Sequence, residues 1–105
     1  MSEVLSRRRY TFKPRFDAQL NLGAAEIRVA VLNLGKEVLG SHFEVEILSE
    51  KDNIIEVRCE AATGELVYEM DSKLMYRILN FCEKNNLDFS VEEMEAKSHE
   101  FDEYV

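Results

Sequence analysis

Hydrophobic and polar residues alternate along much of this chain, and the period of the alternation changes from one segment to the next. In residues 6–16, SRRRYTFKPRF, every second residue from Arg8 to Phe16 falls on one face of an extended strand. The opposite face carries Arg9, Thr11, Lys13 and Arg15. Because Pro14 has no N–H to donate, we expect the paired part of this strand to end near Lys13.

Residues 20–39 change to the period of a helix. Apolar residues return at alternating steps of three and four, which makes one stripe along a helix. These residues are Leu20, Ala24, Ile27, Val31, Leu34 and Val38. A strand is the alternative, because Ile27, Val29 and Val31 are β-branched and also alternate. The stripe favours the helix, since it continues for nearly five turns at about 3.6 residues per turn.

Residues 42–61 contain two alternating runs separated by the polar stretch SEKDN, which is typical of a hairpin. The apolar positions of both runs have odd numbers, so both sets must share one face of the sheet. A register that pairs Ile47 with Ile55 satisfies this condition and places Glu44 opposite Arg58. We therefore predict this register for the hairpin.

The remainder of the chain predicts a short strand, a helix and a final strand. TGELVYEM, residues 63–70, alternates at Leu66, Tyr68 and Met70 and could add a strand. Residues 71–86 have a helical arc of apolar residues, with Asp71 or Ser72 as the expected N-cap. Alternation in residues 87–92 predicts the last strand.

The predicted order of elements is strand, helix, strand, strand, helix, strand, which is the order of the ferredoxin-like split βαβ sandwich. We therefore expect a single α+β domain over residues 1–96, with two helices on one face of a four-stranded antiparallel sheet. Residues 97–105 are expected to form a flexible acidic tail. The alternative architecture is a helix packed on a longer antiparallel meander, if residues 64–70 form a true strand.

Composition indicates a globular protein of the cytoplasm. Apolar residues make up 46% of the 105 residues, too many for a disordered chain. The longest apolar run, residues 29–32, is far shorter than a membrane span, and no secretory signal is evident, so no membrane interaction is expected. Cys59 and Cys82 have no CxxC spacing, and we expect both to be reduced core residues.

The basic stretch at the N-terminus raises the question of what its cations face. Residues 1–16 hold five Lys or Arg and one Glu, whereas the whole chain has a net charge of −8. In the predicted sheet the first strand lies between two acidic strands, so cross-strand ion pairs explain Arg9 without a ligand. Arg7 and Arg8 are explained less well, and nucleic-acid binding through them is the alternative. The acidic total argues against it, because nucleic-acid-binding domains are usually basic.

Catalytic and cofactor motifs are absent from the sequence. There is no HExxH, GxGxxG, P-loop or GxSxG pattern, and neither His42 nor His99 has a partner at motif spacing. We therefore predict no cofactor, no metal site and no catalytic residues.

The function predicted from these features is a small, acidic, non-enzymatic module that regulates or binds another protein, with an unrecognised enzyme as a further alternative. The second predicted strand is an exposed sheet edge, which favours a homodimer through that edge. The tail adds aromatic residues among acids, which can anchor on a basic groove. The candidate partner-binding residues are Arg7, Arg8, Arg9, Glu44, Glu46, Phe101 and Tyr104.

Overall fold

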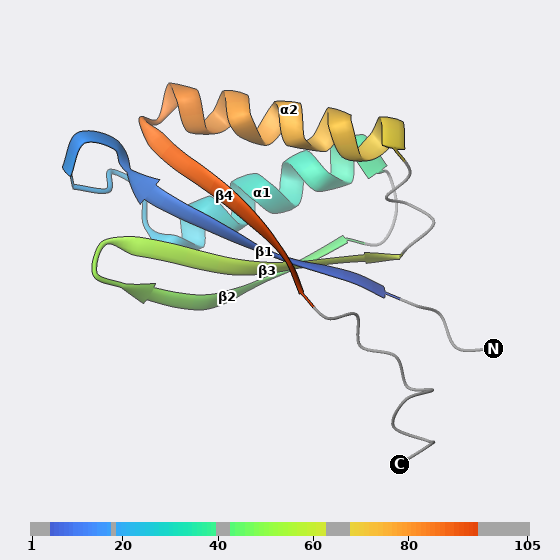
Figure 1. The fold of residues 1–105 in the computed structure, drawn as a ribbon, viewed down its shortest axis with the longest axis horizontal. Coiled ribbons are helices and arrows are strands. Elements are labelled where there is room, and N and C mark those ends of the chain that lie inside the picture. Colours follow the sequence, from blue (N-terminus) through green and yellow to red (C-terminus); the bar gives the residue numbers. More distant parts are fainter. Residues whose placement is uncertain (1–4, 18, 40–42, 63–67, 95–105) are drawn as a thin grey trace, which may run out of the picture.

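The computed structural model describes residues 5–17, 19–39, 43–62 and 68–94 as two helices over one antiparallel sheet. In chain order the elements are β1 (Leu5–Pro14), the 3-10 turn η1 (Arg15–Asp17), α1 (Ala24–Leu39), β2 (Phe43–Lys51), β3 (Ile54–Ala62), α2 (Tyr68–Lys84) and β4 (Leu87–Met94). The strand order is β2-β3-β1-β4, and both helices cover the same face (Figure 1). The predicted ferredoxin-like split βαβ sandwich is confirmed, and the described residues do not form the longer meander.

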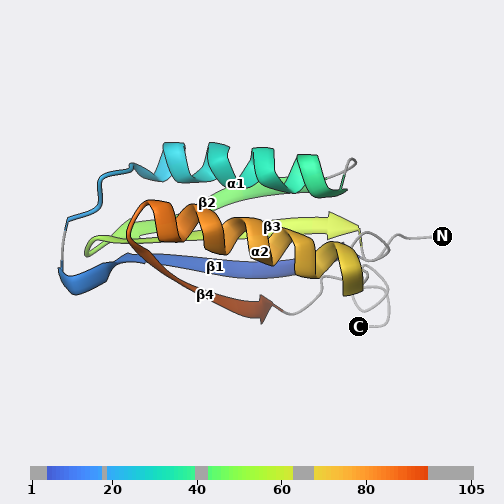
Figure 2. The same ribbon diagram turned by 90° about the horizontal axis from the view of Figure 1, so that it is seen from above.

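The two helices lie side by side over different strands. Figure 2 shows α1 on the side of β2, and α2 between α1 and the side of β4. Contacts of α1 with β2 and of α2 with β4 follow from this arrangement. Neither helix of the described part has the length and the apolar character that a membrane-spanning helix requires. The predicted domain limit at residue 96 and the predicted tail 97–105 lie outside the described residues.

Helix α1 is shorter than its apolar stripe predicts. It begins at Ala24, where Gly23 N–H donates to Glu26 Oε1 at 3.1 Å and Ile27 N–H donates to the Gly23 carbonyl at 3.1 Å. The Glu26 side chain thus caps the Gly23 N–H, and the Ile27 bond is the first backbone hydrogen bond of the helix. Leu20 lies before the helix, yet it packs on the core, and its N–H donates to the Asn53 side chain at 3.2 Å.

Helix α2 begins earlier than predicted. Tyr68 and Met70 belong to the helix, so the predicted alternation of a strand through them is wrong. An alternation of three residues is too short to exclude a helix, and the rest of the predicted strand lies outside the described residues. Asp71 is consequently a helical residue rather than the N-cap, and its carboxylate binds Arg8.

The β2–β3 hairpin has a tighter turn than predicted. Both strands extend to a two-residue turn, Asp52 and Asn53, with φ values of 55° and 63°. Two left-handed residues are typical of the type I′ turn, which matches the twist of a hairpin. A β-bulge between Ile47 and Ser49 then shifts the register by one residue.

The predicted register of this hairpin is therefore wrong. Ile47 pairs with Val57 rather than with Ile55, and Glu44 lies opposite Glu60 rather than Arg58. The two-residue turn alone would put the apolar residues of the two strands on opposite faces. The bulge returns them to one face. The apolar residues of both strands therefore share a face of the sheet, as predicted, although the register differs.

One core lies between the sheet and the helices. Its buried members are Tyr10, Phe12, Ala24, Ile27, Val31, Leu39, Phe43, Val45, Ile55, Val57, Cys59, Ala61, Leu74, Ile78, Cys82 and Leu87. Gly35 lets α1 approach β2 closely, because a Cβ atom at this position would lie 2.3 Å from the Phe43 ring. The predicted apolar face of β1 ends before Phe16, which lies in η1 with a φ of 56° and is 94% exposed.

Candidate functional site

The open face of the sheet carries ion pairs that join its strands. Arg7 Nε lies 2.6 Å from Glu60 Oε2, and Arg9 lies 3.9 Å from Glu56 and 3.5 Å from Glu92. The two arginines come from β1, and their partners come from both neighbouring strands. The arrangement predicted for Arg9, a basic central strand between acidic strands, is therefore present in the structure, and it extends to Arg7.

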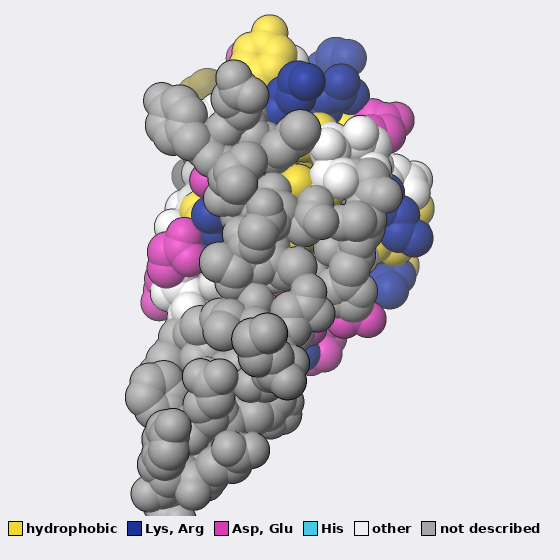
Figure 3. All heavy atoms as spheres, turned by 90° about the vertical axis from the view of Figure 1, so that its right-hand side faces the viewer, with side chains coloured by type: hydrophobic (Ala, Val, Ile, Leu, Met, Phe, Trp, Pro, Cys, Tyr) yellow, Lys and Arg dark blue, Asp and Glu magenta, His cyan; other side chains and the backbone are white. Residues whose placement is uncertain are grey.

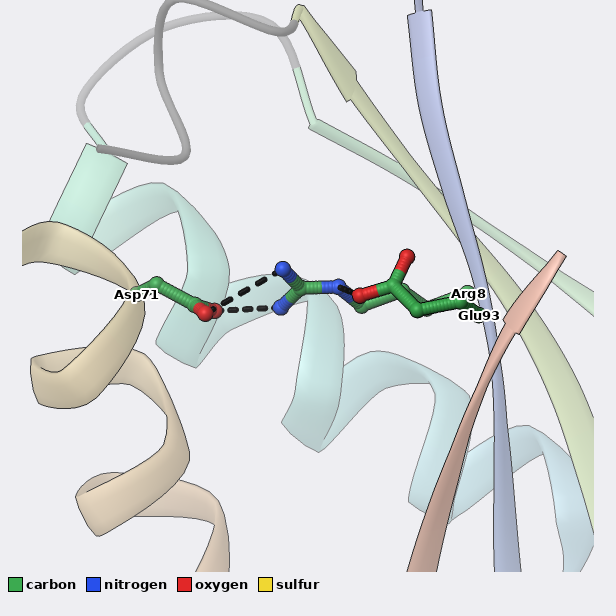
Figure 4. Close-up of polar contacts among 3 residues, drawn as sticks. All are labelled: Arg8, Asp71 and Glu93. Atoms are coloured by element: carbon green, nitrogen blue, oxygen red, sulfur yellow. Dashed lines mark hydrogen bonds and ion pairs between the residues drawn. The ribbon is translucent and has the colours of Figure 1, made fainter. Parts of the chain in front are cut away.

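Arg8 points to the other face of the sheet, toward α2. Its guanidinium makes a bidentate pair with Asp71, in which Nη1 binds Oδ1 and Nη2 lies 3.1 Å from Oδ2. Its Nε donates to Glu93 Oε1 of β4 at 2.9 Å (Figure 4). Burial alone would lower the pKa of Arg8, but the hydrogen bond and charge of Asp71, together with Glu93, raise it above its ordinary value. Arg8 thus joins β1, α2 and β4.

The other predicted partner-binding residues fall into two groups. Glu44 and Glu46 are exposed on β2, which is an edge strand as predicted, and Glu46 accepts a hydrogen bond from Arg58 at 2.7 Å. Phe101 and Tyr104 lie outside the described residues, as do both histidines. Figure 3 views the molecule from one end, where Lys and Arg side chains lie among Asp and Glu side chains on the coloured part of the surface.

A groove of about 520 Å³ follows the free edge of β2. One side is a stripe of α1 residues spaced by four, Arg28, Leu32 and Lys36. The opposite side consists of β2, from Phe43 to Ile47, with Arg58 and Glu60 of β3. We call this the α1–β2 groove.

The lining of the α1–β2 groove holds three basic residues, Arg28, Lys36 and Arg58, and three acidic residues, Glu44, Glu46 and Glu60. Arg28 Nε donates to the Val45 backbone carbonyl at 2.8 Å, a contact that holds the guanidinium beside the strand edge. Within the described residues, neither Arg28 nor Lys36 forms an ion pair with a carboxylate. Arg58 and Glu60, by contrast, are paired with Glu46 and Arg7. The groove therefore holds two cations that can receive an anion.

A second groove, of about 360 Å³, lies between the two helices. Leu34 and Phe81 provide its apolar surface, and Arg77 and Lys84 lie on its border. Arg77 is occupied, since its Nη1 lies 2.8 Å from Glu37 Oε2 of α1. Among the described residues this groove has one cation without a carboxylate partner, Lys84, whereas the α1–β2 groove has two.

Cys59 and Cys82 are free thiols of the core, as predicted. Burial raises the pKa of Cys82 to about 12 and raises that of Cys59 further. A thiol in this environment stays protonated at neutral pH and is a poor nucleophile. In the described segments, no cluster of His, Cys, Asp and Glu could hold a metal ion.

Sequence reasoning did not identify the α1–β2 groove. The spacing of Arg28, Leu32 and Lys36 is visible in the sequence, and it marks one stripe of a helix. What the sequence does not show is that this stripe lies beside the free edge of β2, because the helix and the edge meet only in the folded chain.

Comparison with solved structures shows the same fold in parts of larger proteins. An amidase of the hydantoinase/carbamoylase family from Burkholderia multivorans matches 92% of this chain at 12% identity, with a TM-score of 0.54. An aminobenzoyl-glutamate utilization protein from Klebsiella pneumoniae matches 91% at 8% identity, with a TM-score of 0.50. The chain spans only 28% and 29% of the lengths of these two proteins. At this identity the likeness establishes the fold.

A designed protein, Foldit4, has the same fold over its whole length, at 19% identity and a TM-score of 0.51. No family model matches the sequence. No curated protein matches it either.

These comparisons correct the predicted function. The natural structures named above are an amidase and an aminobenzoyl-glutamate utilization protein, and neither is a small protein-binding or nucleic-acid-binding module. The sequence prediction followed from the lack of a catalytic motif, which does not by itself identify a binding module. That the chain is not itself an enzyme stays a prediction.

Proposed function

We propose that this chain is an enzyme-related domain that binds the substrate of an amide hydrolysis, a carboxylate-bearing amide, in the α1–β2 groove. The observation that carries the proposal is the pair of cations in this groove, Arg28 and Lys36, which have no carboxylate partner among the described residues. The volume of about 520 Å³ lies in the range of small-molecule sites. The names of the similar enzymes, an amidase and an aminobenzoyl-glutamate utilization protein, support an amide of an amino acid as the ligand.

The groove offers complementary groups to the two ends of such a ligand. Arg28 and Lys36 lie about 12 Å apart along α1, so each can bind a different carboxylate of the ligand through a charge-assisted hydrogen bond, which is stronger than a neutral one. Because the Val45 carbonyl faces Arg28, the backbone of Val45 faces the free edge of β2, and its N–H is directed there too. This N–H can donate to the amide carbonyl of the ligand, while Leu32 packs on its apolar part.

Hydrolysis itself requires an activated water or nucleophile, which this proposal assigns to another part of the enzyme. The buried thiols support this division, since burial raises the pKa of both. The same two free cysteines support the cytoplasm as the compartment, because thiols persist in reducing surroundings.

Titration with 4-aminobenzoyl-glutamate, followed by NMR chemical shifts, tests the proposed function. We expect shifts of the backbone amides around Val45 and Lys36, and at least about tenfold weaker binding in Arg28→Gln/Lys36→Gln, since each charged hydrogen bond contributes about 1.5–3 kcal/mol. The matched control is Arg77→Gln/Lys84→Gln, which removes the same two charges beside the other groove and should bind as the parent does.

Equally weakened ligand binding in both double variants would show a general charge effect and would reject the α1–β2 groove as the binding site. Absence of shifts at about 10 mM ligand, a concentration above that expected even for weak sites, would reject the proposed function. Release of aminobenzoate by the chain alone would show that the chain carries the hydrolytic groups, and would reject their assignment to another part of the enzyme.

A further inference from the structure

The two free edges of the sheet differ in how they are protected. At the β2 edge, Arg28 donates a hydrogen bond to the outward-facing carbonyl of Val45, and a bulge interrupts the strand between Ile47 and Ser49. A side chain on the edge and a bulge are two of the devices by which proteins prevent edges from pairing. The β2 edge, which the sequence suggested as a dimer contact, is therefore obstructed.

The β4 edge has neither device in the described residues. Its register with β1 runs without a shift from Arg7 opposite Met94 to Pro14 opposite Leu87. Arg15 N–H donates to the Asn86 carbonyl at 3.0 Å, so the backbone of the even-numbered residues of β4 faces β1. The backbone groups of Leu87, Phe89, Val91 and Glu93 face outward, and no described residue outside β4 bonds to them.

Apolar side chains line the helix side of this edge. Val91 is 40% exposed, and Phe89 is partly exposed although its ring contacts Tyr10 at a centroid distance of 5.1 Å. Leu79 of α2 is 53% exposed. Because Arg77 faces α1 through its ion pair, Leu79, two residues or about 200° further around the helix, lies on the flank toward β4.

The acidic side chains of β4 are neutralised within the chain. Asp88 lies 3.2 Å from Arg15, Glu92 lies 3.5 Å from Arg9, and Glu93 lies 2.9 Å from Arg8. Charged residues on an edge normally keep two copies apart by repulsion. Here each carboxylate already has a cation, so the repulsion between two copies of β4 is reduced.

We propose that β4 pairs with β4 of a second copy of this chain, antiparallel and two-fold symmetric, so that the two sheets become one. The two-fold axis passes beside Phe89. This register places Leu87 against Val91 of the second copy on the apolar side, and Asp88 against Ser90 on the open side. A register shifted to centre on Ser90 would oppose Asp88 and Glu92, two like charges. The β4 edge is on the opposite side of the sheet from the α1–β2 groove, so the dimer and the proposed ligand site can fail independently.

The mass of the chain in solution, measured by light scattering after gel filtration, tests the dimer. We expect twice the 12.2 kDa of one chain at high concentration and dissociation on dilution. Val91→Pro removes an N–H that faces outward and so breaks bonds only between copies, because proline is tolerated on an edge whose N–H is not paired. This variant should be monomeric, and Val91→Thr, which keeps the N–H and the branched shape, should remain a dimer.

Hydrogen exchange of the parent chain identifies the edge without relying on a variant. The amides of Phe89 and Val91 should exchange at least about tenfold more slowly at high than at low protein concentration. A monomeric mass up to about 500 µM overturns the proposal, since no dimer of useful stability would then exist. A dimer that protects the amides of Phe43 and Val45 instead also overturns it, because the contact would be the β2 edge.

Discussion

The ion pair of Arg8 with Asp71 predicts a specific loss of stability when its carboxylate is removed. The Arg8 side chain is 13% exposed and that of Asp71 is 31% exposed. Asp71→Ala leaves the guanidinium among core residues, with only Glu93, which is 70% exposed, as its anion. A cation without its main partner in a largely buried position destabilises the folded state.

The expected loss is about 2 kcal/mol, between about 1 kcal/mol for an exposed pair and about 3–5 kcal/mol for breaking a buried one. For a domain of this size it corresponds to a melting temperature lower by about 8–16 °C. Urea unfolding followed by far-UV circular dichroism gives the free energy of unfolding. Asp88→Ala is the matched control, because it removes the same group from a 64% exposed position next to Arg15, and it should cost less than about 0.5 kcal/mol.

A loss below about 1 kcal/mol for Asp71→Ala, or a loss equal to that of Asp88→Ala, would show that burial does not make this ion pair sensitive. The double variant Arg8→Met/Asp71→Leu extends the test. Replacement of a buried ion pair by apolar residues of similar size is often neutral, so the double variant should be more stable than Asp71→Ala alone.

Three further predictions concern other positions. Gly35→Ala should lower the free energy of unfolding by about 1–3 kcal/mol in urea titrations, because the new methyl group would overlap the Phe43 ring; an unchanged midpoint would contradict the close approach. Phe16→Gly should raise the free energy of unfolding by about 1 kcal/mol, since Phe16 is exposed and has a left-handed backbone. A decrease in the free energy of unfolding would show that the Phe16 ring makes a stabilising contact. The buried thiols should destabilise the fold at alkaline pH, because burial raises the folded pKa of Cys82 to about 12 and that of Cys59 further, whereas the unfolded pKa is about 8.5. Their contribution is complete below pH about 8.5 and declines as the pH rises toward the folded pKa, so Cys82→Ala should unfold with a weaker dependence on pH between about 8.5 and 11 than the parent; an equal dependence would refute the assignment.

The order of the elements could be predicted because each apolar stripe is a local property of the sequence. Steps of three and four in residues 24–39 and steps of two in β1 and β4 are the periods of a helix and a strand. The ends of the elements could not be read in the same way. Leu20 continues the apolar stripe of α1, but it packs on the core from outside the helix, so its position in the stripe reflects burial and not helical backbone.

The hairpin shows where pattern reasoning reaches its limit. The shared face of β2 and β3 follows from the parity of their apolar residues, and the structure retains it. More than one register satisfies this parity. The choice depends on the left-handed conformation of Asp52 and Asn53 and on the bulge after Ile47, which are backbone properties without a unique sequence signal.

Hydrophobic period and residue charge are local and additive, so the fold class and the charge balance of the first strand could be predicted before the chain is folded. Which cations are already paired depends instead on the tertiary structure. It joins Arg8 to Asp71, 63 residues away along the chain, and leaves Arg28 and Lys36 beside the edge of β2. Within the described residues, Arg28 and a bulge lie on the β2 edge, whereas the outward backbone groups of β4 have no bond to another element. Ion pairs, grooves and sheet edges depend on distances between residues far apart along the chain, and folding alone sets those distances.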